Sequence, residues 1–168
     1  GSVTVALGAD GMQGDTRFAD VLAEYGATVE RGVSTTTVTG ARLLGGTFDF
    51  ADISDLAPTI AALAPFAEGS TTIEGVGFIR RKETDRIAAV VTELRRLGVE
   101  ATELDDGFRI EPGPVSPGVV HTYDDHRMAM SFAVLGLRAS GVSIADPGCV
   151  AKTFPRFWET LALMRSAT

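Results

Sequence analysis

The sequence predicts an α/β (α+β) fold made of small strand–helix units, and two observations support this. Apolar residues recur with helical spacing over 18–25 and over 87–97, and a glycine that can end a helix follows each stretch, at Gly26 and Gly98. Short β-prone runs lie between the helical stretches, so that strands and helices alternate along the chain. Such alternation is typical of layered α/β or α+β domains.

The expected elements follow in chain order. Strands are expected at runs rich in β-branched residues, which cover 3–7, 35–39, 71–73 and 142–144. Helices are expected over 18–25, 56–66, 87–97 and 128–137, and a last one opens at 152–156 and continues to 164. The longest apolar stretch is interrupted by Pro58 and Pro65 and is shorter than the roughly 18 apolar residues that a membrane helix needs. We therefore expect no membrane partner.

Two landmarks recur with one spacing, which predicts an internal repeat. Gly98 follows Gly26 by 72 residues, and Gly141 follows Gly69 by the same 72 residues. The sequence therefore predicts two complete βαβ-type units and the start of a third, which opens at 152–156. If the repeat is real, a segment outside this chain must complete the third unit, and the chain is a fragment of a longer protein.

The composition excludes some classes of function. The chain has 15 Lys+Arg against 22 Asp+Glu and a formal net charge of -7, so a nucleic-acid partner is not expected, because such proteins need a basic surface. Cys149 is the only cysteine, which excludes an internal disulfide and favours a reducing, cytoplasmic location. Two histidines and one cysteine are too few to predict a zinc site.

Charged residues gather where the helices of the repeat begin. The segment 80–86 holds Arg80, Arg81, Lys82 and Arg86. A helix N-terminus attracts anions and disfavours cations, so this cluster is consistent with an anion-binding site. The alternative is a solvated face on which Glu83 and Asp85 form ion pairs of about 0.3–0.5 kcal/mol each.

The segment 123–130 is a second candidate site. Asp124 or Asp125 can cap the following helix, and Met128 and Met130 are typical of core packing. A single histidine such as His126 is more often a structural hydrogen-bonding group than a catalyst. Arg127 suits an anionic ligand, because a guanidinium binds a carboxylate or phosphate through two hydrogen bonds.

Asp55 precedes an apolar helix, and two interpretations of it stay open. It can be the N-cap of that helix. It can also be a general base that takes a proton from a substrate hydroxyl.

Several blocks of the sequence carry one combined signal. They are Lys82-Glu83-Thr84-Asp85-Arg86, Asp125-His126-Arg127-Met128-Ala129-Met130, Ala151-Lys152-Thr153-Phe154-Pro155, the stretch 12–20 that begins Met12-Gln13-Gly14-Asp15, and Asp146-Pro147-(x)-Cys149. Taken in register, these blocks resemble the 5-enolpyruvylshikimate-3-phosphate synthase family. The likeness extends along essentially the whole chain. It identifies residues 1–168 as a single C-terminal domain of a two-domain enzyme whose N-terminal domain is absent from this chain.

The resemblance implies a reaction and its partners. Members of this family transfer the enolpyruvyl group of phosphoenolpyruvate to the 5-hydroxyl of shikimate 3-phosphate and release phosphate, without a metal or organic cofactor. It implies an enolpyruvyl-transferase-type domain of repeated small units, and substrates bound between two such domains. The expected partners are the two small anionic substrates and the missing N-terminal domain.

The resemblance also implies roles for individual residues. By position, Asp55 is the base at the 5-hydroxyl, and Glu83 is the acid that protonates the methylene carbon of phosphoenolpyruvate. Lys82 corresponds to a contact with shikimate 3-phosphate, as does Asp55, and Lys82 is also expected to be catalytic as a proton relay. The residues that correspond to phosphoenolpyruvate contacts are Arg86, His126, Arg127 and Lys152.

One position departs from the family and three rival functions remain. Some members have an asparagine four positions before the lysine of the Lys82–Arg86 block, whereas this chain has Phe78 there. The nearest rival is the related UDP-N-acetylglucosamine enolpyruvyl transferase, which the blocks beginning at Lys82 and His126 disfavour. A non-catalytic anion-binding domain and an RNA-end-processing enzyme are the others, and the acidic charge disfavours the latter.

Overall fold

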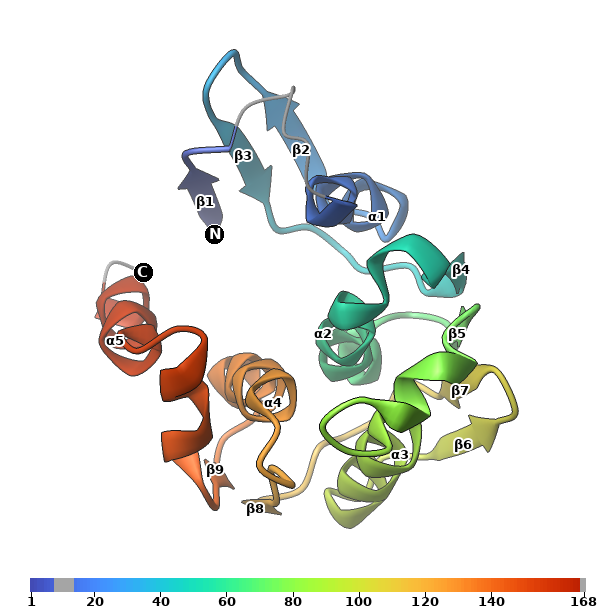
Figure 1. Ribbon diagram of the computed structural model, residues 1–168. Helices are drawn as coiled ribbons and strands as arrows, with labels where there is room; N and C mark the ends of the chain where they lie inside the picture. The colour runs from blue at the N-terminus through green and yellow to red at the C-terminus, as the bar shows by residue number, and fades with distance from the viewer. Residues whose placement is uncertain (8–13, 167–168) are drawn as a thin grey trace.

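The computed structural model describes residues 1–7 and 14–166, which form an α/β arrangement of short helices and strands (Figure 1). The α-helices of this part are α1 (Phe18–Glu24), α2 (Ala57–Leu63), α3 (Arg86–Arg96), α4 (His126–Arg138) and α5 (Phe157–Ser166). The strands are β1 (Ser2–Val5), β2 (Thr28–Arg31), β3 (Thr36–Thr39), β4 (Gly46–Asp49), β5 (Thr71–Glu74), β6 (Ala101–Leu104), β7 (Gly107–Ile110), β8 (Gly118–Val120) and β9 (Val142–Ile144). Met12 and Gln13, which open one of the blocks quoted above, lie outside the described residues.

Short 3₁₀ helices join these elements. They are η1 (Gly14–Arg17), η2 (Ala51–Leu56), η3 (Ala64–Phe66), η4 (Gly77–Arg81) and η5 (Pro147–Lys152). Three of them carry or adjoin predicted site residues. Asp55 lies in η2 and Lys152 lies in η5, and η4 directly precedes Lys82.

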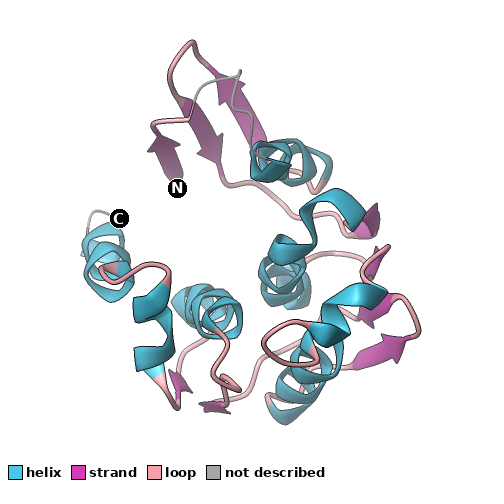
Figure 2. Ribbon diagram, in the orientation of Figure 1, coloured by secondary structure: helices cyan, strands magenta, loops and turns pink. Residues whose placement is uncertain are grey.

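The strands form three sheets that follow one another around an open ring (Figure 2). The strand orders are β1-β3-β2, β4-β5-β7-β6 and β8-β9. In the view of Figure 2 the strands lie toward the outside of this ring, and α2 and α4 lie toward its middle. Helices α2 and α4 also pack against each other.

The predicted repeat is present in the structure. Strands β4 and β5 are parallel and joined through α2, and strands β8 and β9 are parallel and joined through α4. Each of α1 and α3 is followed by an antiparallel pair of strands, β2–β3 and β6–β7. Thr59 of α2 and Ser131 of α4, which are 72 residues apart, share a hydrogen bond of 3.2 Å between their hydroxyl groups. Equivalent positions of the two units therefore meet where the inner helices pack.

The core lies between the four-stranded sheet and the helices that cover it. Phe48, Ile73 and Phe108 are paired across β4, β5 and β7, and all three are buried. Ile60 of α2 and Leu94 of α3 are fully buried in the same cluster. Burial of such side chains stabilises the fold by roughly 1.5–3 kcal/mol each. This packing holds the beginnings of α2, α3 and α4 in place.

Some elements differ from the sequence prediction. The predicted helix over 56–66 is divided into η2, α2 and η3, because Pro58 and Pro65 begin new helical segments rather than continuing one. The last helix begins at Phe157, after η5 and a turn. Strands β2, β4, β6, β7 and β8 were not predicted, because glycine or charged residues interrupt the short β-prone run in each of them. In the described part of the chain, no helix is long and apolar enough to cross a membrane.

Candidate active site

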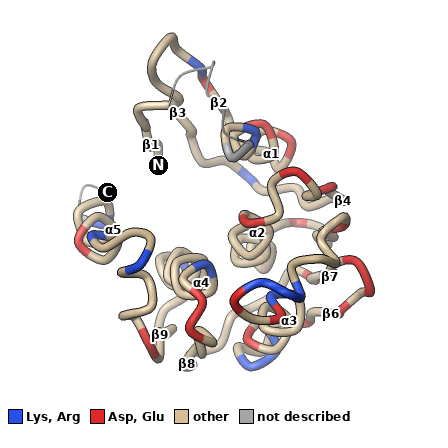
Figure 3. The backbone as a smooth tube through the Cα atoms, in the orientation of Figure 1, with Lys and Arg blue, Asp and Glu red and all other residues tan. Residues whose placement is uncertain are grey.

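The predicted site residues all lie where helices α2, α3 and α4 begin, or at the end of η5. Figure 3 shows acidic and basic residues gathered at the starts of α3 and α4. We call this group the charged cluster, and its members are Asp55, Lys82, Glu83, Arg86, Asp125, His126, Arg127 and Lys152. The structure brings all seven residues predicted from the sequence together, and Asp125 is an eighth. Their catalytic roles stay predictions.

Arg86 is the centre of the charged cluster. It is the first residue of α3 and only 1% exposed, and its guanidinium donates to three carboxylates. Nε lies 2.7 Å from Asp125, Nη1 lies 2.8 Å from Asp55, and Nη2 lies 2.8 Å from Glu83. Burial alone lowers the pKa of Arg86, but the hydrogen bond and charge of Asp125, together with the charges of Glu83 and Asp55, outweigh this effect and raise the pKa. Arg86 therefore stays charged and fixes the three carboxylates relative to one another.

Asp55 does not cap α2, which corrects one of its two interpretations. The N-cap residue of α2 is Leu56, and no side chain caps this end. The Asp55 carboxylate instead contacts Arg86, Arg127 at 3.3 Å and Lys82 at 3.9 Å. Burial raises the pKa of Asp55, but the charges of Arg127, Arg86 and Lys82 together outweigh burial and hold the pKa below its ordinary value. Asp55 is therefore ionised at neutral pH and able to accept a proton.

Glu83 accepts from Arg86 Nη2, the same nitrogen that lies 3.4 Å from Asp125. Its second carboxylate oxygen, Oε1, is 4.0 Å from Lys152 Nζ and 3.9 Å from His126 Nδ1. Burial lowers the pKa of His126, and this effect outweighs the opposing charge of Asp125, so the imidazole is neutral at pH 7. Lys152 is about half exposed, which leaves its ammonium free to move toward a ligand.

Two buried polar atoms of the cluster lack a hydrogen-bond partner among the described residues. They are His126 Nδ1 and Arg127 Nε, on neighbouring residues at the start of α4. Buried polar groups in proteins are normally hydrogen-bonded, so these two unpaired atoms are exceptions in the described part of the chain. The cluster has four cationic side chains and three carboxylates, which favours an anionic ligand.

Asp125 was considered in the sequence only as a helix cap, and the structure gives it a second role. Its carboxylate caps α4 by accepting the Arg127 N–H at 2.8 Å, and it also pairs with Arg86. The residue is completely buried. The preceding Tyr123 and Asp124 have φ of 55° and 56°, a strained conformation for residues other than glycine that costs of order 1–3 kcal/mol each. The sequence signal that could have identified Asp125 as a site residue is its position directly before His126 and Arg127.

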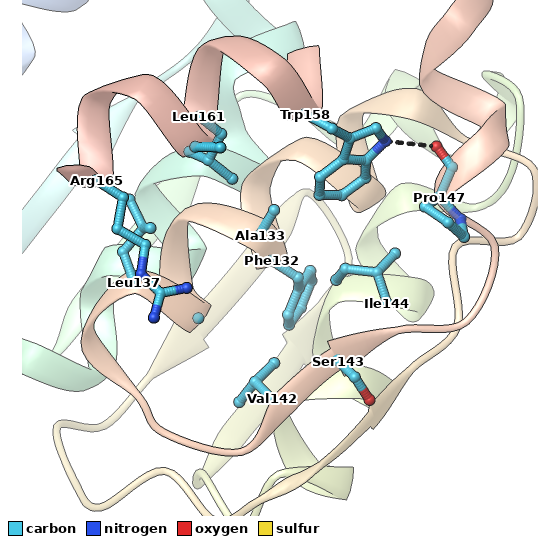
Figure 4. Close-up of a pocket in the computed structure, with 12 residues that line it drawn as sticks. Phe132, Ala133, Leu137, Val142, Ser143, Ile144, Pro147, Trp158, Leu161 and Arg165 are labelled. Carbon is cyan, nitrogen blue, oxygen red and sulfur yellow. Dashed lines mark hydrogen bonds between the residues drawn. The ribbon is translucent and has the colours of Figure 1, made fainter.

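Larger hollows, of about 360 and 570 Å³, lie away from the charged cluster. A small polar pocket of about 140 Å³ adjoins Asp55 and Lys82. A groove of about 360 Å³ between α4, β9 and α5 is lined mainly by apolar side chains such as Phe132 and Leu161, with Trp158 donating to the Pro147 carbonyl at 2.9 Å (Figure 4). Its lining lacks the paired acids and cations of the cluster. Among the described residues, no group of acidic, histidine and cysteine side chains is arranged to hold a metal ion.

Comparisons with known proteins agree on the type of fold. An EPSP synthase from Acinetobacter baumannii superposes with a TM-score of 0.84 at 32% identity, over 98% of this chain and 41% of that one. The enolpyruvyl transferase NikO from Streptomyces tendae superposes with a TM-score of 0.66 at 26% identity, over 88% of this chain and 34% of that one. The fold, with charged residues at the starts of its helices, is that of an enolpyruvyl transferase domain.

The sequence comparisons define the family. The family model "EPSP synthase (3-phosphoshikimate 1-carboxyvinyltransferase)" matches residues 1–161, and the chain belongs to this family. The 3-phosphoshikimate 1-carboxyvinyltransferase of Nostoc punctiforme is 54% identical over 87% of this chain, and that of Salmonella arizonae is 46% identical over 96%. The chain spans only 34% and 38% of the length of these two relatives.

Proposed function

We propose that this chain provides one half of the active site of a 3-phosphoshikimate 1-carboxyvinyltransferase, as the C-terminal domain of a two-domain enzyme. The proposed reaction joins the enolpyruvyl group of phosphoenolpyruvate to the 5-hydroxyl of shikimate 3-phosphate and releases phosphate. The observation that carries the proposal is the convergence of Lys82, Arg127 and Lys152 on Asp55 and Glu83. Two phosphorylated substrates repel each other, and cations are needed to hold them together.

The two carboxylates suit opposite proton transfers. In the proposed addition, the 5-hydroxyl oxygen bonds to C2 of phosphoenolpyruvate while its proton passes to Asp55, and the methylene carbon takes a proton from Glu83. In the elimination that follows, the bond from C2 to the phosphate oxygen breaks and the leaving phosphate takes the proton held by Asp55. Glu83 takes a proton back from the new methyl group, which regenerates the enol double bond and restores both carboxyl groups. Arg86 contacts both acids and keeps them apart, so each can act on a different substrate.

Substrate binding would also change the strength of the base. In the structure, Arg127 and Lys82 are engaged with Asp55 and contribute to its low pKa. If a substrate phosphate or carboxylate draws these cations toward itself, their hold on Asp55 weakens and its pKa rises. Asp55 then becomes a stronger base when the site is filled.

We further propose that the chain alone binds these anions weakly and does not turn them over. Its relatives are about three times as long. The family resemblance implies that the other domain supplies further groups that bind both substrates. The test is phosphate release from phosphoenolpyruvate with shikimate 3-phosphate, by the chain alone, by the chain mixed with the remainder of the enzyme, and by the whole enzyme. Release that needs both substrates and the remainder supports the proposal, and release by the chain alone contradicts the claim of a half site.

The role of Glu83 is tested in the whole enzyme. Glu83→Gln keeps the size of the side chain but cannot supply a proton, so we expect kcat to fall about 10²- to 10⁴-fold with a smaller change in KM. Glu103→Gln, on β6 and paired with Arg80 rather than with the cluster, is the matched control. Activity close to that of the unchanged enzyme in Glu83→Gln would exclude Glu83 as the acid. Replacement of shikimate 3-phosphate by UDP-N-acetylglucosamine tests the rival substrate.

A further inference from the structure

Glu93 is a buried acidic residue that the proposed reaction does not use. It lies in α3 and is completely inaccessible to solvent. An ionised carboxylate is costly to bury unless it is hydrogen-bonded, so its partners indicate what it is for. Glu93 is seven residues after Arg86, which places both side chains on one face of α3.

Two hydrogen-bond donors to Glu93 lie in the segment before α4, and a third partner, Arg96, lies in α3 itself. Its carboxylate accepts the His121 N–H at 3.0 Å and the Tyr123 hydroxyl at 2.6 Å, and Arg96 Nε lies 3.3 Å away. Burial and, to a smaller extent, the hydrogen bond to Glu93 together raise the pKa of Tyr123 to about 12, so the hydroxyl remains a donor. We call Glu93 and the two groups that donate to it from His121 and Tyr123 the Glu93 clamp.

The Glu93 clamp acts on the two residues that hold unfavourable backbone conformations. Tyr123 and Asp124 are the residues other than glycine with positive φ in the described part of the chain. Such conformations persist only when surrounding contacts hold them. Two residues of α3 hold this turn. Glu93 accepts from the His121 N–H before the turn and from the Tyr123 hydroxyl in it, and Arg86 donates to Asp125 after it.

We propose that Glu93 is a positioning residue. It holds the Tyr123–Asp124 turn so that the side chains of His126 and Arg127 face the other members of the charged cluster. Asp125, His126 and Arg127 follow this turn directly, and the unpaired atoms His126 Nδ1 and Arg127 Nε depend on its geometry for their direction. Glu93 touches no substrate in this account. The inference rests on the proposed function of His126 and Arg127 as ligands of an anionic substrate.

The test uses the titration of His126 by nuclear magnetic resonance in this chain. The chain has two histidines, so His121→Gln assigns both signals. The groups around His126 are Glu83, Asp125, Arg127 and Lys152, which are left unchanged. Glu93→Gln keeps the shape of the side chain but lets it accept from only one of the two donors. Tyr123→Phe removes one donor and keeps the ring.

We expect Glu93→Gln to raise the pKa of His126 toward its ordinary value, because a released turn exposes the ring. Tyr123→Phe should shift it less in the same direction. The Kd for inorganic phosphate, followed through the same signal, should rise about tenfold in Glu93→Gln, since displaced groups bind poorly. Glu111→Gln, an exposed glutamate paired with Arg109, should change neither quantity.

Gly98→Ala separates positioning from simple loss of stability, because it weakens the end of α3 without touching the Glu93 clamp. If Glu93→Gln behaves like Gly98→Ala, with a lower unfolding temperature but an unchanged His126 titration and phosphate Kd, the proposal is overturned. If even the unchanged chain binds no phosphate, the proposed anion site fails. The His126 titration still decides the positioning role in that case.

Discussion

Asp55 and Glu83 both contact Arg86, yet their surroundings differ. Asp55 has three cationic side chains no more than 3.9 Å away, whereas Glu83 has two no more than 4.0 Å away, Arg86 and Lys152, and lies beside the neutral imidazole of His126. The tertiary structure therefore gives two similar carboxylates different surroundings, which sequence motifs alone cannot show.

The low pKa of Asp55 predicts a pH dependence of stability. Its pKa is lower in the folded chain than in the unfolded one, so its contribution is fully present above the unfolded value of about 3.9 and is lost as the pH falls through the folded value. We expect Asp55→Asn to be less stable than the unchanged chain near pH 7, and the difference to shrink below about pH 4. Urea unfolding of both between about pH 2.5 and 7 measures this. A difference independent of pH would show that Asp55 does not titrate as described.

At the scale of secondary structure, α3 organises the candidate site. Its beginning is capped by Asp85, which accepts the Ala88 N–H at 3.0 Å, and it carries both Arg86 and Glu93. Its end is fixed by Gly98, whose φ of +81° permits the Val99 N–H to bond the Leu94 carbonyl at 3.0 Å. The helix is thus held at both ends, and this keeps Arg86 and Glu93 at a constant spacing.

Gly98→Ala tests the importance of this helix end. A side chain at positive φ is strained, and the new Cβ would lie 3.0 Å from Ser116 Oγ. We expect the free energy of unfolding to fall by about 1 kcal/mol or more, measured with urea. Gly113→Ala is the control, because a Cβ there meets nothing within 4 Å and its φ is not positive. Equal effects of the two changes would contradict this account of the α3 end.

At the scale of the whole molecule, a local excess of cations exists within an acidic chain. The formal net charge is -7, but the charged cluster contains more cationic groups than carboxylates. Lys82 and Lys152 are each 40% exposed or more, so salt screens their attraction for anions. The acidic remainder of the chain repels anions. Anion binding is therefore expected at the charged cluster.

Salt should therefore weaken anion binding by this chain. We expect the Kd for inorganic phosphate to rise about three- to tenfold between about 20 and 200 mM sodium chloride. Arg127→Gln should raise the Kd about tenfold at low salt, since it removes a partly buried cation and its unpaired Nε. Arg156→Gln, an exposed cation paired with Glu159, should leave the Kd nearly unchanged. Isothermal titration calorimetry distinguishes these outcomes, and a Kd insensitive to salt would argue against an electrostatic site.

Much of the fold could be predicted from the sequence, and the errors of that prediction have physical causes. Long helices such as α3 and α4 were recognised because their buried faces repeat with helical spacing over several turns. Strands such as β4 and β6 were missed because four residues carry too little pattern, and their pairing with β5 and β7 depends on residues distant in the sequence. The 72-residue repeat was visible because Gly26 and Gly98 follow α1 and α3 in the same way, each with a positive φ.

The sequence by itself determined the elements' types, the repeat and the chemistry available at Asp55, Glu83 and Arg127. Only the tertiary structure decided that Arg86 is buried among three carboxylates, that Asp55 is paired rather than a cap, and that Glu93 holds the turn before α4. The reason is that local periodicity reflects interactions between near neighbours. Distances among side chains 31, 39 or 72 residues apart follow instead from how α2, α3 and α4 pack.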